Sequence, residues 1–258
     1  MHVPEPIPTD LRDESFAGID YHVRGQLVPE LQLELSGAPV MFEHHVLLWK
    51  EPGVEIEVKK LAKGVKRMVA GLDFFVTRAT GPGRIAFSRD APGQVIPLHL
   101  SQGQSLNVRE HQFVAASDAL EYTYERVQGA RNMLLGGSGI FVDNFTAGSG
   151  DAIVWVHANG NAFEVVLDAG EQIDVEAGAW LYKDTSVTLE SVGVGFKTSL
   201  LGGGGKFTWN RFTGPGRLAI QTMFIDPYEA RQQDDQGQTQ GAVEGSVVGS
   251  VLGGLLKS

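Results

Sequence analysis

The sequence contains no cysteine among its 258 residues. Disulfide bonds, cysteine-ligated metals and thiol nucleophiles are therefore excluded. Positive charge is also scarce, because 21 Lys and Arg stand against 31 Asp and Glu for a net charge of -10. An acidic surface repels phosphate backbones, so we expect no nucleic-acid partner. The first 15 residues lack the apolar core of a signal peptide, and we expect a cytoplasmic protein.

Signatures of common catalytic and cofactor sites are missing as well. Gly205-Lys206 is followed by Phe207, where a phosphate-binding loop needs Ser or Thr. No His-x-His pair occurs, which is the metal-binding pattern of cupin barrels, and no Gly-x-Ser-x-Gly nucleophile elbow is present. We therefore predict a protein that is not an enzyme, with no catalytic residues, no cofactor and no metal site.

Glycine, in contrast, is abundant at 33 residues, and much of it recurs at a fixed interval. One mark is Gly-x-Gly before an apolar run, at residues 81, 148 and 214, which are 67 and 66 residues apart. A second mark begins at residues 37, 103 and 170 and leads to an apolar pair ten residues later. Such a period predicts repeated units that stack and share a core. The glycines that we assign to repeated turns are Gly83, Gly150, Gly216, Gly37, Gly103 and Gly170.

The local period within each unit is two. Leu31, Leu33 and Leu35 alternate with polar residues, which is typical of a half-buried strand. The run 152–156 is almost continuously apolar, which indicates a strand covered on both faces. Short strands, glycine-rich turns and scarce helical patterns predict an all-β fold, a sandwich or rolled double sheet. We expect three similar units about a pseudo-threefold axis, each covering its neighbour's strand edge.

The composition changes at both ends of the repeated region. After residue 226 the chain becomes rich in Gln, Asp and Gly, and further glycines then fall every four residues. The apolar residues 241–256 are too few to span a bilayer. Three interpretations of this segment are open: a mobile tail, a helix that packs in an oligomer, or a peripheral contact at the inner membrane face. The predicted divisions are an extension 1–17, β-units 18–80, 81–147 and 148–226, and a tail 227–258.

Four tryptophans are candidates for stacking on a ligand. Trp155 and Trp180 lie in apolar strand patterns, which favours a core position. Trp209 follows a tetraglycine stretch and is the best candidate for an exposed aromatic contact. Together with Gly203 and Gly204 it forms the predicted contact for a ligand or partner.

These motifs carry a resemblance that covers about residues 18–226. Three Gly-x-Gly turns, the Gly-x-x-[LI]-[ND]-Val segments and a glycine-rich loop before a Gly-x-Gly resemble the bacterial branch of the family named for altered inheritance of mitochondria. The resemblance implies the fold of the tryptophan RNA-binding attenuation protein, a double-stranded β-helix unit, here three times in one chain. It implies no catalytic residues, and the RNA and tryptophan binding of the attenuation protein do not follow from fold alone.

The sequence leaves three hypotheses about function. The first is an assembly or scaffold protein that binds copies of itself or another protein. The second is a small-molecule binding module that uses clefts between the β-units. The third, which the missing histidine pattern disfavours, is a cupin-like metalloenzyme.

Overall fold

A computed structural model describes the following residues of the chain: 2–8, 12–60, 75–127, 140–193 and 208–223. They form 21 β-strands and one short 3₁₀ helix, η1 (His44–Val46), without an α-helix. The predicted all-β class is therefore confirmed. The same residues contain no helix that is long and apolar enough to span a membrane.

Strand formation follows the apolar patterns of the sequence. In β4 (Glu30–Leu35) the alternating side chains of Leu31, Leu33 and Leu35 are buried, whereas Glu34 is exposed. In β15 (Ala152–Asn159) every side chain before the last residue is buried. A continuous apolar run thus becomes a strand enclosed on both faces, as its pattern predicted.

Eighteen of the strands fall into three sets of six. Set 1 consists of β4 (Glu30–Leu35), β5 (Val40–Phe42), β6 (Leu47–Lys50), β7 (Glu55–Lys60), β8 (Phe75–Thr80) and β9 (Gly83–Phe87). Set 2 consists of β10 (Gly93–Leu100), β11 (Ser105–Arg109), β12 (Phe113–Ser117), β13 (Leu120–Val127), β14 (Ile140–Ala147) and β15 (Ala152–Asn159). Set 3 consists of β16 (Ala162–Leu167), β17 (Gln172–Glu176), β18 (Trp180–Asp184), β19 (Thr188–Gly193), β20 (Thr208–Thr213) and β21 (Gly216–Gln221). The remaining strands, all near the N-terminus, are β1 (Glu5–Pro6), β2 (Arg12–Phe16) and β3 (Ile19–Arg24).

The strands of each set pair in the same antiparallel order. The first and third strands both pair with the sixth, while the second and fourth both pair with the fifth. The ladder between the third and sixth strands is irregular in all three sets, with one extra residue in the third strand. Each of the six glycines assigned to repeated turns has a positive φ, between 80° and 158°.

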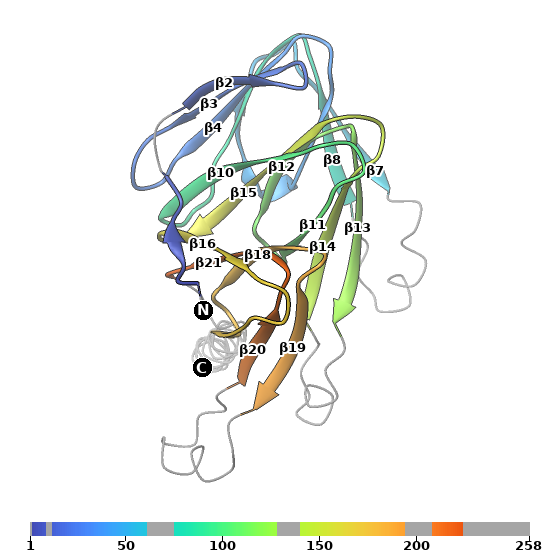
Figure 1. Ribbon diagram of the computed structural model, residues 1–258. Helices are drawn as coiled ribbons and strands as arrows, with labels where there is room; N and C mark the ends of the chain where they lie inside the picture. The colour runs from blue at the N-terminus through green and yellow to red at the C-terminus, as the bar shows by residue number, and fades with distance from the viewer. Residues whose placement is uncertain (1, 9–11, 61–74, 128–139, 194–207, 224–258) are drawn as a thin grey trace, which may run out of the picture. The chain divides into compact units, whose positions relative to one another are not determined.

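Two further ladders join one set to the next. Strand β12 of set 2 pairs with β5 of set 1, and β18 of set 3 pairs with β11 of set 2. The result is four sheets of seven, six, five and three strands. Figure 1 shows β10, β15 and β12 side by side in the six-stranded sheet, and β11 beside β14 in the seven-stranded one.

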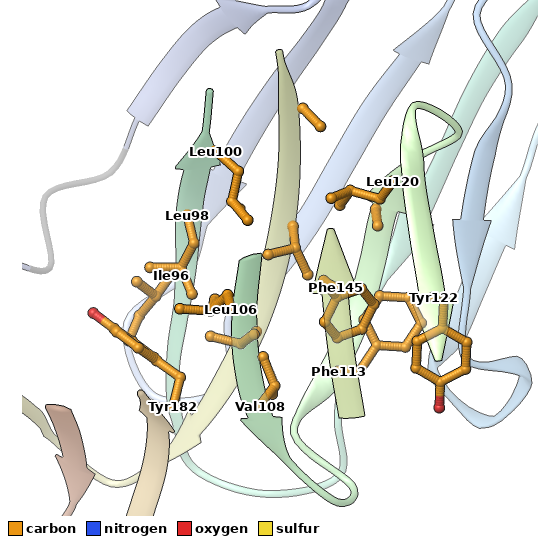
Figure 2. Packing of buried hydrophobic residues seen from close by; sticks show 14 of the residues in the cluster. Ile96, Leu98, Leu100, Leu106, Val108, Phe113, Leu120, Tyr122, Phe145 and Tyr182 are labelled. Atoms are coloured by element: carbon orange, nitrogen blue, oxygen red, sulfur yellow. The ribbon is translucent and has the colours of Figure 1, made fainter. Parts of the chain in front are cut away.

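The largest buried cluster draws on all three sets. Leu106 and Phe145 of set 2 pack in one cluster with Met41 of set 1 and Tyr182 of set 3. Figure 2 shows the aromatic part of this cluster, where the ring of Phe113 lies 4.9 Å from that of Phe145. Because the sets share this core, they are not independent folding units, and residues 1–223 form one compact unit.

Candidate assembly interface

Of the predicted contact residues, Trp209 lies within the part of the chain that the structure describes. Its side chain, on β20, is 37% exposed, and it lies opposite Glu176 of β17. Gly203, Gly204 and the tail 227–258 lie outside the described residues. The predicted ligand contact at Trp209 therefore stays a prediction.

A groove lies elsewhere, between the β3–β4 turn and strand β10. Its volume is about 580 Å³, and its lining includes Leu27, Gln94 and Asn161. None of the residues that line it is charged. Such a lining offers hydrogen bonds and apolar contact to a neutral molecule. It provides no side chain that could serve as a general acid or base.

One fully enclosed titratable group is His157 of β15, which is 0% exposed. Burial, and then the positive charge of Arg89, lowers the pKa of His157 to about 4. Arg89 in turn donates hydrogen bonds to Glu43, at 2.9 Å, and to the carbonyl oxygen of Phe113, at 2.8 Å. A neutral histidine sealed inside the core cannot exchange protons with a substrate in solvent, so this group is structural.

One group of side chains in the described segments has the spacing of metal ligands. His2, Asp168 and Glu171 each place a ligand atom within 4.8 Å of the others. His2 Nδ1 lies 2.9 Å from Glu171 Oε2, and this hydrogen bond is the main reason that the pKa of Glu171 falls to about 2. The sequence analysis missed the group because 169 residues separate His2 from Glu171. All three residues are near the surface, where such pairs are common without a metal.

The ladders that join the sets are the most specific feature of the molecule. At the first junction Met41 of β5 lies opposite Ala116 of β12. At the second, Asn107 of β11 lies opposite Lys183 of β18. Each junction thus pairs the second strand of one set with the third strand of the next set.

Strands at the same two positions have a partner on one side only, among the described ladders, at the ends of the series. Among the described strands, β6, the third of set 1, pairs with β9 alone, and β17, the second of set 3, pairs with β20 alone. Among the described ladders, none joins β6 to β17. Within the part of the chain that the structure describes, two strand edges are therefore open, which we call the β6 edge (Leu47–Lys50) and the β17 edge (Gln172–Glu176).

Burial at corresponding positions shows what the β6 edge lacks. Val114 of β12 and Leu181 of β18 are 1% and 0% exposed. Leu48 occupies the corresponding place in β6, 66 residues before Val114, and is 56% exposed. Beside it Trp49 is 37% exposed. The apolar side chain at this position is thus buried at both internal junctions but exposed to solvent at the β6 edge.

Lysine contacts repeat at the same place. Lys183 Nζ donates to the carbonyl oxygen of Val187 at 2.7 Å and to Asn107 Oδ1 across the second junction at 2.8 Å. Lys50 Nζ, on the β6 edge, donates to the carbonyl oxygen of Val54 at 2.9 Å. Because Val54 corresponds to Val187, Lys50 already holds the orientation that Lys183 uses to reach the neighbouring set.

The β17 edge presents the other half of the junction. Asp174 corresponds to Asn107 and is paired with Arg211 of β20 through two hydrogen bonds of 2.7 Å. The hydrogen bonds from Arg211 lower the pKa of the Asp174 carboxyl. Asn107 is 4% exposed, whereas the Asp174 side chain is 40% exposed. The β17 edge therefore ends the series with an accessible carboxylate.

Trp209 belongs to the same end of the series. The corresponding residues of sets 1 and 2, Val76 and Val142, are 4% and 1% exposed. Val76 packs in a cluster with set 2, and Val142 packs in a cluster with set 3. At this position the side chain is thus covered by the following set, and set 3 has no following set among the described residues.

The fold and these two edges define an all-β protein whose strand sets are joined through their edges. Residues 21–223 match the model of the family described as mitochondrial biogenesis AIM24. The chain belongs to this family, and the resemblance found in the sequence is confirmed.

Two streptococcal proteins are similar to the chain. An uncharacterized protein of Streptococcus pyogenes serotype M6 is 25% identical over 221 residues, which cover 80% of this chain and 86% of that protein. The crystal structure of protein SPYM3_0169 from Streptococcus pyogenes matches with a TM-score of 0.65 and 19% identity, and covers 84% of this chain and 99% of that one. The second likeness supports the fold alone.

Sequence reasoning did not single out Leu48, Lys50 or Asp174 as contact residues. The correspondence of Asn107 with Asp174 was visible in the repeat, and so was that of Leu48 with Leu181. Alone, these matches did not indicate an interface, because burial at each position was unknown. The signal that could have found it is a chemical change at one repeat position, from Asn107 to a charged Asp174.

Proposed function

We propose that this protein is a non-enzymatic assembly protein whose copies associate head to tail, the β17 edge of one copy pairing with the β6 edge of the next. The observation that carries the proposal is the exposure of Leu48, since its counterparts Val114 and Leu181 are both buried at internal junctions. Exposed strand edges readily template pairing with another chain, so natural proteins usually cover or block them.

The internal junctions supply the register of the contact. Both place corresponding residues opposite each other, and both lead to the same pairing for the two free edges. Asp174 would lie opposite Lys50 of the next copy, and Val175 opposite Trp49. Pairing would supply main-chain hydrogen bonds to both edges and bury Leu48. Burial of this half-exposed leucine is worth about 1 kcal/mol.

The proposal includes the finer fold that the sequence suggested. Three repeats of a double-stranded β-helix unit account for the strand order shared by the three sets and for the irregular ladder in each. A pseudo-threefold ring within one chain would need a third junction, between β6 and β17, and the described ladders contain two. We therefore place the third junction between copies. Such a head-to-tail contact forms a ring where its geometry closes and a filament where it does not.

A second candidate function is the binding of a small neutral molecule in the groove beside Leu27 and Gln94. The volume of about 580 Å³ lies within the range of small-molecule sites. A thermal-shift screen tests this function. A rise in melting temperature that Gln94→Ala removes would support it, and no rise with any neutral metabolite would contradict it.

Sedimentation velocity of the full chain over a range of concentrations tests the assembly function. We expect the wild type to associate and Leu48→Asp to remain monomeric, because a carboxylate would be buried in the apolar contact. Val166→Asp is the matched control, since Val166 is also 56% exposed but lies on β16, which pairs with β21 and is neither of the two free edge strands. A monomeric wild type, or a Leu48→Asp variant that associates as the wild type does, would overturn the proposal.

A further inference from the structure

We infer that an ion pair between Lys50 of one copy and Asp174 of the next selects the partner and fixes the register of the contact between copies. The inference rests on the head-to-tail pairing proposed above. It concerns chemistry that distinguishes this contact from the two junctions inside the chain.

The central pair differs at each of the three junctions. Met41 and Ala116 are apolar, and Asn107 and Lys183 join a neutral acceptor to an ammonium group over 2.8 Å. At the contact between copies the corresponding residues are Asp174 and Lys50, which carry opposite charges. The two junctions formed during folding thus join an apolar pair or a lysine with an uncharged acceptor. The contact that must find a separate molecule joins two opposite charges. Complementary charge increases association rates and rejects wrong partners.

Both groups are oriented for this contact before it forms. The hydrogen bond from Lys50 Nζ to the Val54 carbonyl oxygen, at 2.9 Å, matches that from Lys183 to Val187, at 2.7 Å. Arg211 holds the Asp174 carboxylate through both of its oxygens. A carboxylate offers about four lone-pair sites, so Asp174 can accept from Lys50 while it stays paired with Arg211.

The carboxylate that follows Lys50 in the sequence is already occupied. Glu51 follows Lys50 and accepts from the backbone N–H of Arg84 at 3.0 Å and from its guanidinium at 2.7–2.8 Å. Asp184 and Arg217 make the corresponding contacts beside Lys183. The Glu51 carboxylate is thus directed to its own strand partner, and Lys50 is available to Asp174.

Burial makes the pair selective for one register. Lys183 is only 7% exposed at the internal junction, so Lys50 would lose most of its water in the same position. A slip by one residue would place its charge against Ile173 or Val175, and a buried charge without a partner is strongly unfavourable. The correct register therefore gives the Lys50 charge a carboxylate partner, and neighbouring registers leave it without one.

Charge reversal in the full-length chain tests the pair. In Lys50→Asp both free edges carry a carboxylate, and in Asp174→Lys/Arg211→Asn both carry an ammonium group. The second change in the latter variant removes a like-charge contact across β17 and β20. We expect each variant alone to associate at least about 30-fold more weakly than the wild type. An equimolar mixture should recover association, because every contact in an alternating assembly then joins opposite charges.

A neutral variant tests whether misfolding, rather than charge, causes the loss of association. Asp174→Asn/Arg211→Asn copies the Asn107 and Asn144 pair of β11 and β14, which occupies the corresponding place in set 2. It should fold and associate through Lys50. Mixed with Lys50→Asp it should form one kind of contact, Asp174 to Lys50, because the carboxylate introduced at position 50 would face a neutral amide at position 174. Circular dichroism establishes the fold of each variant before its association is measured.

The outcomes separate this inference from the proposed function. If Leu48→Asp abolished association but charge reversal left it unchanged, the inference about the ion pair would be overturned and the proposed assembly function would stand. Charge-reversed variants that fold but do not recover association on mixing would also overturn it. A monomeric wild type would overturn the proposed function itself.

Discussion

The second internal junction and the two free edges are built from corresponding residues, yet they differ in what covers them. Leu181 and Lys183 of β18 are 0% and 7% exposed because β11 lies against their strand. Leu48 is 56% exposed on an edge of the same design. The exposure of Leu48 therefore reflects its position at the end of the series of strand sets. Leu48 and Lys50 are the same residue types as Leu181 and Lys183, which are buried at the internal junction.

The largest difference is expected for the leucine at the two places. Leu181→Asp puts a carboxylate into the core, and we expect it to lower the free energy of unfolding by more than about 4 kcal/mol. Leu48→Asp should change the monomer by no more than about 0.5 kcal/mol. Urea denaturation at concentrations below association measures both. A large loss of monomer stability with Leu48→Asp would break the comparison, because the β6 edge would then be covered within the chain.

A smaller difference is expected for the acceptor of the lysine. Asn107→Leu removes the oxygen that Lys183 reaches across the second junction, and we expect it to cost about 1–3 kcal/mol of unfolding free energy. Asp174→Leu removes an exposed ion pair with Arg211 and should cost at most about 1 kcal/mol in the monomer. Association of the Asp174→Leu variant should nevertheless weaken. Equal losses of monomer stability in the two variants would contradict this account.

Acid should distinguish the two kinds of junction further. Arg211 of β20 lies opposite Asp174 and also opposite Glu190 of β19. In the proposed contact, Lys50 of the next copy would face Asp174 as well. Arg211 already lowers the pKa of Asp174, and Lys50 would lower it further on association. The associated form then binds fewer protons, so association should be retained at neutral pH and lost as the pH falls through the pKa of this carboxyl.

Sedimentation velocity at stepped pH measures this loss, with circular dichroism to show that the chains stay folded. Asp174→Asn/Arg211→Asn is the control, because it replaces the titrating carboxylate with an amide. If the wild type and this variant dissociated over the same pH range, another group would be responsible.

The smallest expected signal comes from tryptophan. Trp155 and Trp180 are 0% exposed, whereas Trp49 and Trp209 are each 37% exposed near the β6 and β17 edges. Association should shield the second pair from acrylamide and leave the first pair unchanged. Fluorescence quenching as a function of protein concentration checks this, with monomeric Leu48→Asp as the reference. Quenching that does not change as the wild type associates would place the contact elsewhere.

Much of the fold could be predicted from local patterns. The alternation of Leu31, Leu33 and Leu35 has one physical explanation, a strand with one face in the core, and the structure buries all three. The prediction that Trp155 and Trp180 lie in the core is also confirmed, since both are 0% exposed. Period and polarity are local properties of a chain and can be read without coordinates.

The candidate interface could not be predicted in this way. Leu48 and Leu181 are the same residue type in matching segments, and their different exposure depends on which strand lies beside each. Strand order joins residues that are distant in sequence, as the pairing of Asn107 with Lys183 shows. The proximity of His2 to Glu171 could not be predicted for the same reason, because it depends on where the N-terminal segment returns to the fold.

The most direct measurement of the head-to-tail contact is disulfide capture, which has no background because the chain contains no cysteine. Lys50→Cys/Asp174→Cys places thiols at positions that would lie opposite each other between copies, and Met41→Cys/Ala116→Cys places them at the first internal junction. After mild oxidation, we expect covalent oligomers on non-reducing gels from the first variant and monomers with an internal disulfide from the second. If the first variant remained monomeric, with free thiols or with a disulfide inside one chain, the head-to-tail contact would be contradicted.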